Sequence, residues 1–69
     1  MRYSMIIEWS DEDQAFLVLL PEWNSLPMTH GDTYQEAVQR GEELLEALME
    51  SRREHGEPLP EPKIYASAS

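Results

Sequence analysis

One long amphipathic segment constrains the fold of this chain more than any other feature. Between Tyr34 and His55, apolar or small residues recur at spacings of one, three, three, one and three: Ala37, Val38, Gly41, Leu44, Leu45 and Leu48. On an α-helix this spacing forms one stripe and leaves Glu42, Glu43, Glu46, Glu50 and Arg52 largely outside it. Such a helix is about 33 Å long. Because the stripe has to be buried, the residues before it must supply the covering surface.

Both ends of this segment carry helix-terminating signals. Thr33 followed by Glu36 predicts a capping box, in which the hydroxyl accepts from the Glu36 amide and the carboxylate reaches back to the cap amide. Asp32 is favoured beside the positive end of the helix dipole. Gly31 permits the positive φ that a tight exit from a strand often needs, and Gly56 suits the position after the helix. These five residues form the predicted fold signature.

The residues before the helix have the patterns of short strands. Tyr3–Trp9 alternates with period two, and Ala15–Leu20 is apolar on both faces. The polar run Ser10–Gln14 between them predicts an antiparallel hairpin. A third short strand is expected around Met28–His30, and Lys63–Ala66 is a candidate for a fourth. We therefore expect a single α+β domain over residues 1–69: an antiparallel sheet of three to four strands with one long helix on one face.

The chain has 69 residues and no cysteine. A domain of this size buries only about 60% of the surface that its unfolded chain exposes. Disulfides and thiolate metal sites are excluded, so oligomerisation, as a dimer or tetramer, is the expected supplement to stability. The two-faced apolar strand Ala15–Leu20 favours self-association or a partner surface, although neighbouring side chains could also shield it. Gly41 lies in mid-helix at a cost of about 1 kcal/mol, which indicates a close approach to the sheet.

Negative charge dominates the composition. Fourteen acidic residues against five basic ones give a formal net charge of −9. This balance disfavours direct binding to nucleic acids and to anionic membranes, and it suits a basic partner or simply keeps a small protein in solution. The sequence shows no signal peptide and no stretch of about 18 apolar residues, so we expect a cytoplasmic protein.

No catalytic constellation emerges from the sequence. It contains no glycine-rich phosphate loop and no G-x-S-x-G motif. His30 and Asp32 could pair as a base and its orienting carboxylate, or as metal ligands, but no nucleophile or further ligand accompanies them. Asp11, Glu12 and Asp13 lack the spacing of a calcium loop, so a solvated turn is the better interpretation. We therefore expect a non-enzymatic protein without cofactor or metal.

One group of residues is a candidate partner surface: Glu22, Trp23 and the acidic turn Asp11, Glu12 and Asp13. Tryptophan is enriched at the energetic centres of interfaces. Trp23 could instead fold back on the sheet and complete a small core, and this second interpretation is favoured.

The order of these features is similar to that of a known family. "YSMIIEWSDEDQAFLVLL" (3–20), "PEWNSLPMTHGDTYQEAVQRGEELLEALME" (21–50) and "GEPLPEP" (56–62) resemble HicB-like antitoxins over nearly the whole chain. The shared elements are the hairpin with an acidic turn, Pro-Glu-Trp, Thr-His-Gly-Asp-Thr, the Glu-Ala of the first helical turn, and Gly-x-x-Leu-Pro. The chain departs from the family at Asn24 and Ser25, where a glycine is usual, and at Gly41, where alanine or asparagine is frequent.

The resemblance implies a fold likened to a partial RNase H or double-stranded RNA-binding topology. It also implies that the domain binds and neutralises a HicA-type toxin, a small basic ribonuclease that cleaves messenger RNA. Many relatives repress their own operon through a C-terminal DNA-binding segment. No such segment follows here, so we expect no autoregulation by this chain alone. The alternative is an orphan homo-oligomeric HicB-like domain with a structural or regulatory role and no toxin partner.

Overall fold

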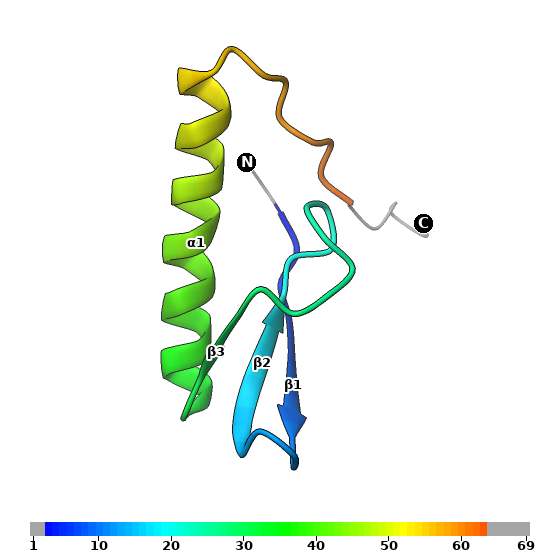
Figure 1. Cartoon of the computed structure of the whole chain (residues 1–69), viewed down its shortest axis with the longest axis vertical. Helices are drawn as coiled ribbons and strands as arrows, with labels where there is room; N and C mark the ends of the chain where they lie inside the picture. The colour runs from blue at the N-terminus through cyan, green and yellow to red at the C-terminus, as the bar shows by residue number, and fades with distance from the viewer. Residues whose placement is uncertain (1–2, 64–69) are drawn as a thin grey trace, which may run out of the picture.

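The computed structural model describes residues 3–63 and contains three strands followed by one helix (Figure 1). The strands are β1 (Ile6–Ser10), β2 (Ala15–Leu19) and β3 (Thr29–Gly31), and the helix is α1 (Tyr34–Glu54). They form one sheet in the order β1-β2-β3, in which both neighbouring pairs are antiparallel. The predicted α+β fold with one helix on a sheet is therefore confirmed.

The first two strands form the predicted hairpin. Ser10 pairs with Ala15, so the connection is a four-residue turn, Asp11–Gln14. Gln14 closes the turn with a positive φ of 53°. Its side-chain amide donates to the Asp11 carbonyl oxygen at 2.6 Å, which fixes the turn from within.

The first strand is shorter than the alternation from Tyr3 suggests. It begins at Ile6, because the Ser4 amide donates to the Glu22 carboxylate rather than to a neighbouring strand. At the other end of the chain, Lys63 is not in a strand. The rest of the segment Lys63–Ala66, which was a candidate for a fourth strand, lies outside the described residues.

The start of α1 is capped almost as predicted. The Glu36 amide donates to Thr33 Oγ1 at 3.1 Å. The Glu36 carboxylate, however, accepts from the amide of Asp32 at 2.9 Å, one residue before the predicted partner. Two amides that the helix itself cannot satisfy are nevertheless paired at this end.

The end of α1 is a Schellman motif. Gly56 has a φ of +67°, its amide donates to the Arg53 carbonyl, and the Glu57 amide donates to the Arg52 carbonyl at 2.8 Å. This pair of hydrogen bonds and the left-handed glycine define the motif. The predicted role of Gly56 is confirmed.

Two other glycines bring the helix and the sheet close together. A Cβ on Gly41 would lie 2.7 Å from Met5 Sδ and 3.1 Å from Val18 Cγ1, which confirms the predicted close approach. Gly31 was predicted to need a positive φ, and this reason was wrong. The positive φ angles among the described residues occur at Gln14 and Gly56. Glycine is needed at position 31 because a Cβ there would lie 2.5 Å from the Ala37 amide nitrogen.

The core lies between β2 and the first half of α1. Val18, Leu20 and Ala37 are fully buried and form its centre. Contacts between helix and sheet are densest at β3 and sparsest at β1, so the helix lies over one side of the sheet (Figure 1). A helix is only about 10–12 Å wide and strands are spaced about 4.8 Å apart, so one helix leaves an outer strand partly uncovered.

Arg52 corrects the prediction that it lies outside the apolar stripe. Its side chain is half-buried, with the guanidinium carbon 5.2 Å from the centre of the Trp23 ring. Nη1 donates to the Pro58 carbonyl oxygen at 2.9 Å. Arg52 therefore joins the end of α1 to the loop after β2 and to the proline-rich segment 57–62.

Candidate partner-binding surfaces

The predicted partner-binding residues lie at opposite ends of the sheet. Asp11, Glu12 and Asp13 are in the turn between β1 and β2, whereas Glu22 and Trp23 are in the loop after β2 (Figure 1). The structure therefore divides the predicted set into two separate places. Neither assignment is tested by the fold itself, so both remain predictions.

The hairpin turn presents its acidic residues to solvent. Asp11, Glu12 and Asp13 are all exposed. Asp11 Oδ1 accepts a hydrogen bond from Trp9 Nε1 at 2.7 Å, and Asp13 Oδ2 accepts one from the Ser10 hydroxyl at 3.1 Å. These contacts give the turn a defined shape while leaving its negative charge available to a partner.

Glu22 has a structural role that the sequence did not indicate. Its carboxylate accepts from the Ser4 amide at 3.1 Å and from the Lys63 amide at 2.7 Å. Partial burial acts to raise the pKa of Glu22, but its hydrogen bonds, above all those from the Lys63 and Ser4 amides, outweigh this effect, so the pKa lies below its ordinary value of 4.5. The ionised side chain thereby ties the start and the end of the described chain together.

The hydrogen bonds of Glu22 with Ser4 and Lys63 predict a pH-dependent contribution to stability. Because the pKa of Glu22 is lower in the folded state, its stabilisation is present above about pH 4.5 and is lost as pH falls through the folded-state pKa. Glu22→Gln should lower the free energy of unfolding by about 1 kcal/mol at neutral pH. Urea titrations of both proteins from pH 7 to pH 3 measure the difference, which should shrink in acid. A difference in the free energy of unfolding that is constant with pH would contradict this role of Glu22.

Trp23 is a half-buried part of the packing. Its ring meets the Tyr3 ring edge-on, with centroids 5.4 Å apart and planes at 64°, and the Arg52 guanidinium lies over it. It packs against the core, as the favoured interpretation predicted. Its buried Nε1 makes no hydrogen bond among residues 3–63. Much of its surface is therefore already used within the chain.

The structure reveals a surface that the sequence reasoning missed, formed by Trp9, Phe16 and Tyr34 and called here the aromatic row. The Trp9 and Phe16 centroids are 5.0 Å apart, and those of Phe16 and Tyr34 are 4.8 Å apart. Trp9 is 48% exposed and Tyr34 55%. The four-residue turn could have indicated the first contact, because it places Trp9 directly opposite Phe16.

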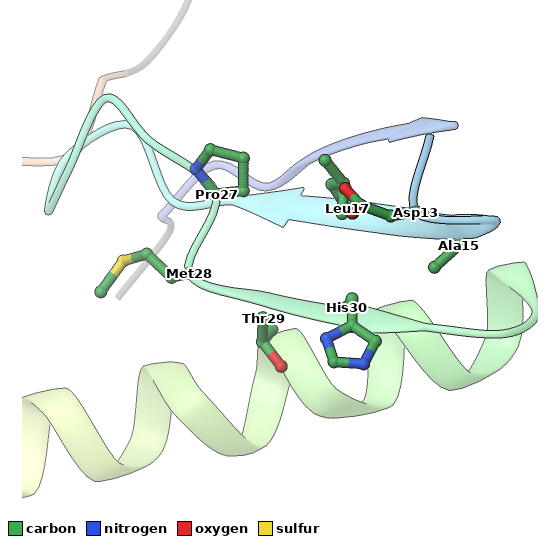
Figure 2. A pocket seen from close by; sticks show the side chains of 7 residues that line it. All are labelled: Asp13, Ala15, Leu17, Pro27, Met28, Thr29 and His30. Atoms are coloured by element: carbon green, nitrogen blue, oxygen red, sulfur yellow. The ribbon is translucent and has the colours of Figure 1, made fainter. Parts of the chain in front are cut away.

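His30 lines an open pocket of about 400 Å³ (Figure 2). Its cross-strand partner is Leu17, and Asp13 and Thr29 also line the pocket. Asp32, the partner considered from sequence, is not part of this lining, and its amide is used by Glu36. Within the described residues no hydrogen bond joins His30 to Asp13 or Thr29, and a nucleophile activated by a histidine requires such contacts.

Other features bear on metals and membranes. Among residues 3–63 there is no group of three or more His, Cys, Asp or Glu side chains that could hold a metal ion. The part of the chain that the structure describes also contains no helix long and apolar enough to cross a membrane.

Comparison of the chain with protein-family models, with curated proteins and with solved structures finds no match.

Proposed function

We propose that this chain is a non-catalytic, antitoxin-like module that binds and neutralises a small basic messenger-RNA-cleaving toxin of the HicA type. The observation that carries the proposal is exposed negative charge that the basic side chains of residues 3–63 leave largely unpaired. Glu42, Glu43, Glu46 and Glu50 are exposed along α1, and the hairpin turn adds three more acidic residues.

Within residues 3–63 none of these seven carboxylates forms a salt bridge, although Asp11 and Asp13 accept hydrogen bonds. The salt bridge within the described residues joins Arg40 Nε to Glu36 Oε1 at 3.6 Å, and both side chains are largely exposed. Surface pairs of this kind contribute little to stability. The net charge of −9 is therefore available to an outside cation, and it accelerates encounter with a basic protein.

The ordered resemblance to HicB-like antitoxins gives the basic partner its proposed identity. A three-stranded sheet with one helix belongs to the same α+β class as the fold that the resemblance implies. The proposal includes a cytoplasmic location, where messenger RNA is available to the toxin.

Co-expression tests the partner directly. The tagged chain is produced together with the product of an adjacent short, basic reading frame and is purified in low and in high salt. We expect the basic protein to co-purify in low salt and to be lost progressively as salt screens the opposite charges. If no basic protein is retained in low salt, the antitoxin role fails.

A second candidate function is self-association without a toxin, as a dimer or tetramer. It is favoured by the sheet face opposite α1, over which no second helix or sheet lies in residues 3–63. Ile6 on this face is 43% exposed, and Leu17 and Leu19 are half-buried. Light scattering at micromolar concentration should then give a multiple of 8.0 kDa. A monomer mass would remove this candidate.

A further inference from the structure

We propose that the aromatic row is the docking surface for arginine side chains of the basic partner. This inference rests on the proposed function, because it assigns a place and a chemistry to the contact. It differs from the sequence prediction, which placed the partner on Glu22, Trp23 and the acidic turn. Of the residues in that prediction, the acidic turn lies beside the aromatic row, because Asp11 accepts the hydrogen bond of the Trp9 indole.

The incomplete cover of the sheet creates this surface. Because α1 lies over β3 and β2, the helix-facing side of β1 is left partly open at Trp9. Phe16 bridges Trp9 to Tyr34 at the start of α1. Val38, one helical turn after Tyr34 on the same side of the helix, is 38% exposed and extends the apolar area. Exposed aromatic residues that touch one another are typical of interaction sites.

Local charge makes the row suited to a cation. The Asp11 carboxylate accepts the Trp9 indole N–H at 2.7 Å, which places a negative group at the ring edge and restrains the indole. Glu12 and Asp13 are exposed on the same turn. A cation over an aromatic face is attracted by the ring, and a carboxylate beside the ring adds to this attraction.

The chain already contains the same type of contact. Arg52 lies over the Trp23 ring at 5.2 Å, at the other end of the sheet. Arginine is better suited than lysine to such stacking, because its planar guanidinium is more weakly hydrated and lies flat on a ring. Among residues 3–63, the aromatic row offers a comparable face over which no arginine lies.

Charge also selects between possible occupants. A second copy of this chain on the aromatic row would bring two chains of net charge −9 together beside their acidic turns. Like charges in an interface are unfavourable, whereas a basic segment is attracted. The row is therefore assigned to a basic protein rather than to a second copy of this chain.

Binding of two peptides tests the assignment. An oligoarginine and an oligolysine of equal length are titrated against the protein in low-salt buffer by calorimetry. Each ring contact is expected to raise the affinity for arginine about two- to fivefold, and the affinity for the more strongly hydrated lysine less, so the arginine peptide should bind several-fold more tightly than the lysine peptide. Trp9→Ser/Tyr34→Ser should weaken arginine binding more than lysine binding and so abolish the preference.

Leu26→Ser is the matched control, because Leu26 is 67% exposed and lies outside the aromatic row. It should leave both affinities unchanged. Circular dichroism establishes that each variant is folded, and Tyr34→Ser alone replaces the double variant if the latter is not. Equal affinities for the two peptides, or an unchanged arginine preference in the variant, would overturn the assignment.

The two proposals can fail separately. If the basic protein co-purifies with Trp9→Ser/Tyr34→Ser as well as with the original chain, the toxin partner stands and the docking surface is wrong. If the arginine preference is found and is lost in the variant, but no basic protein co-purifies, the surface stands and the antitoxin role fails.

Discussion

Replacing Gly31 by alanine is expected to lower the free energy of unfolding by about 3 kcal/mol. The added methyl group would lie 2.5 Å from the Ala37 amide nitrogen and 2.8 Å from its Cα. These are backbone atoms in the first turn of α1, so no side-chain rotation can relieve the overlap. The strand and the helix would have to move apart, and this would open the contact between β3 and α1.

Chemical denaturation followed by circular dichroism measures this loss. Gly56→Ala is the matched control, because a Cβ on Gly56 meets nothing within 4 Å while its φ is +67°. That variant should lose only about 1 kcal/mol, which is the cost of a left-handed conformation for alanine. If the two variants lose the same amount, the close approach at Gly31 is not what requires glycine there.

Leu20→Ala is expected to cost a similar amount, about 3 kcal/mol, by a different mechanism. Leu20 is fully buried, and its removal leaves a cavity between the sheet and the helix. In a chain of 69 residues a loss of this size should lower the melting temperature by about 15 °C. Differential scanning calorimetry gives both quantities.

Leu26→Ala provides the comparison for this cavity. The chemistry of the substitution is the same, but Leu26 is 67% exposed. Its free energy of unfolding should change by no more than about 0.5 kcal/mol. A large loss of unfolding free energy for Leu26→Ala, together with a small one for Leu20→Ala, would contradict the assignment of Leu20 to the core.

Most of the fold follows from local patterns in the sequence. The helix could be predicted because Thr33, Glu36 and Gly56 act on backbone groups within a few residues of themselves. The hairpin could be predicted because a short polar turn joins two apolar runs. Even here the partner of Glu36 was missed by one residue, since two neighbouring amides are within reach of the same carboxylate.

The remaining features depend on distance in space rather than in sequence. Position alone could have placed Arg52 on the buried stripe, because it lies four residues after Leu48 and seven after Leu45 on the helix, whereas its contact with Trp23, 29 positions earlier, has no local signal. The structural role of Glu22 was not predicted, because its hydrogen bonds to Ser4 and Lys63 join segments far apart in the chain. Long-range contacts of this kind have no local pattern.

The candidate partner surfaces also differ in how far the sequence predicts them. The acidic turn was visible in the sequence because its three carboxylates are consecutive. The aromatic row was not, because its exposure depends on where one helix lies across three strands. His30 and Asp13 share a pocket because β3 pairs with β2, which follows the hairpin turn, whereas the neighbour suggested by sequence, Asp32, does not line it.

Inhibition of the basic partner's ribonuclease activity tests the proposed function most directly. Cleavage of a messenger RNA by the purified partner is followed with increasing amounts of this chain in low salt. We expect cleavage to stop when the two proteins are present in equal amounts, and to continue when Trp9→Ser/Tyr34→Ser replaces the original chain. Cleavage that continues undiminished in a large molar excess of the original chain would contradict the proposed neutralisation.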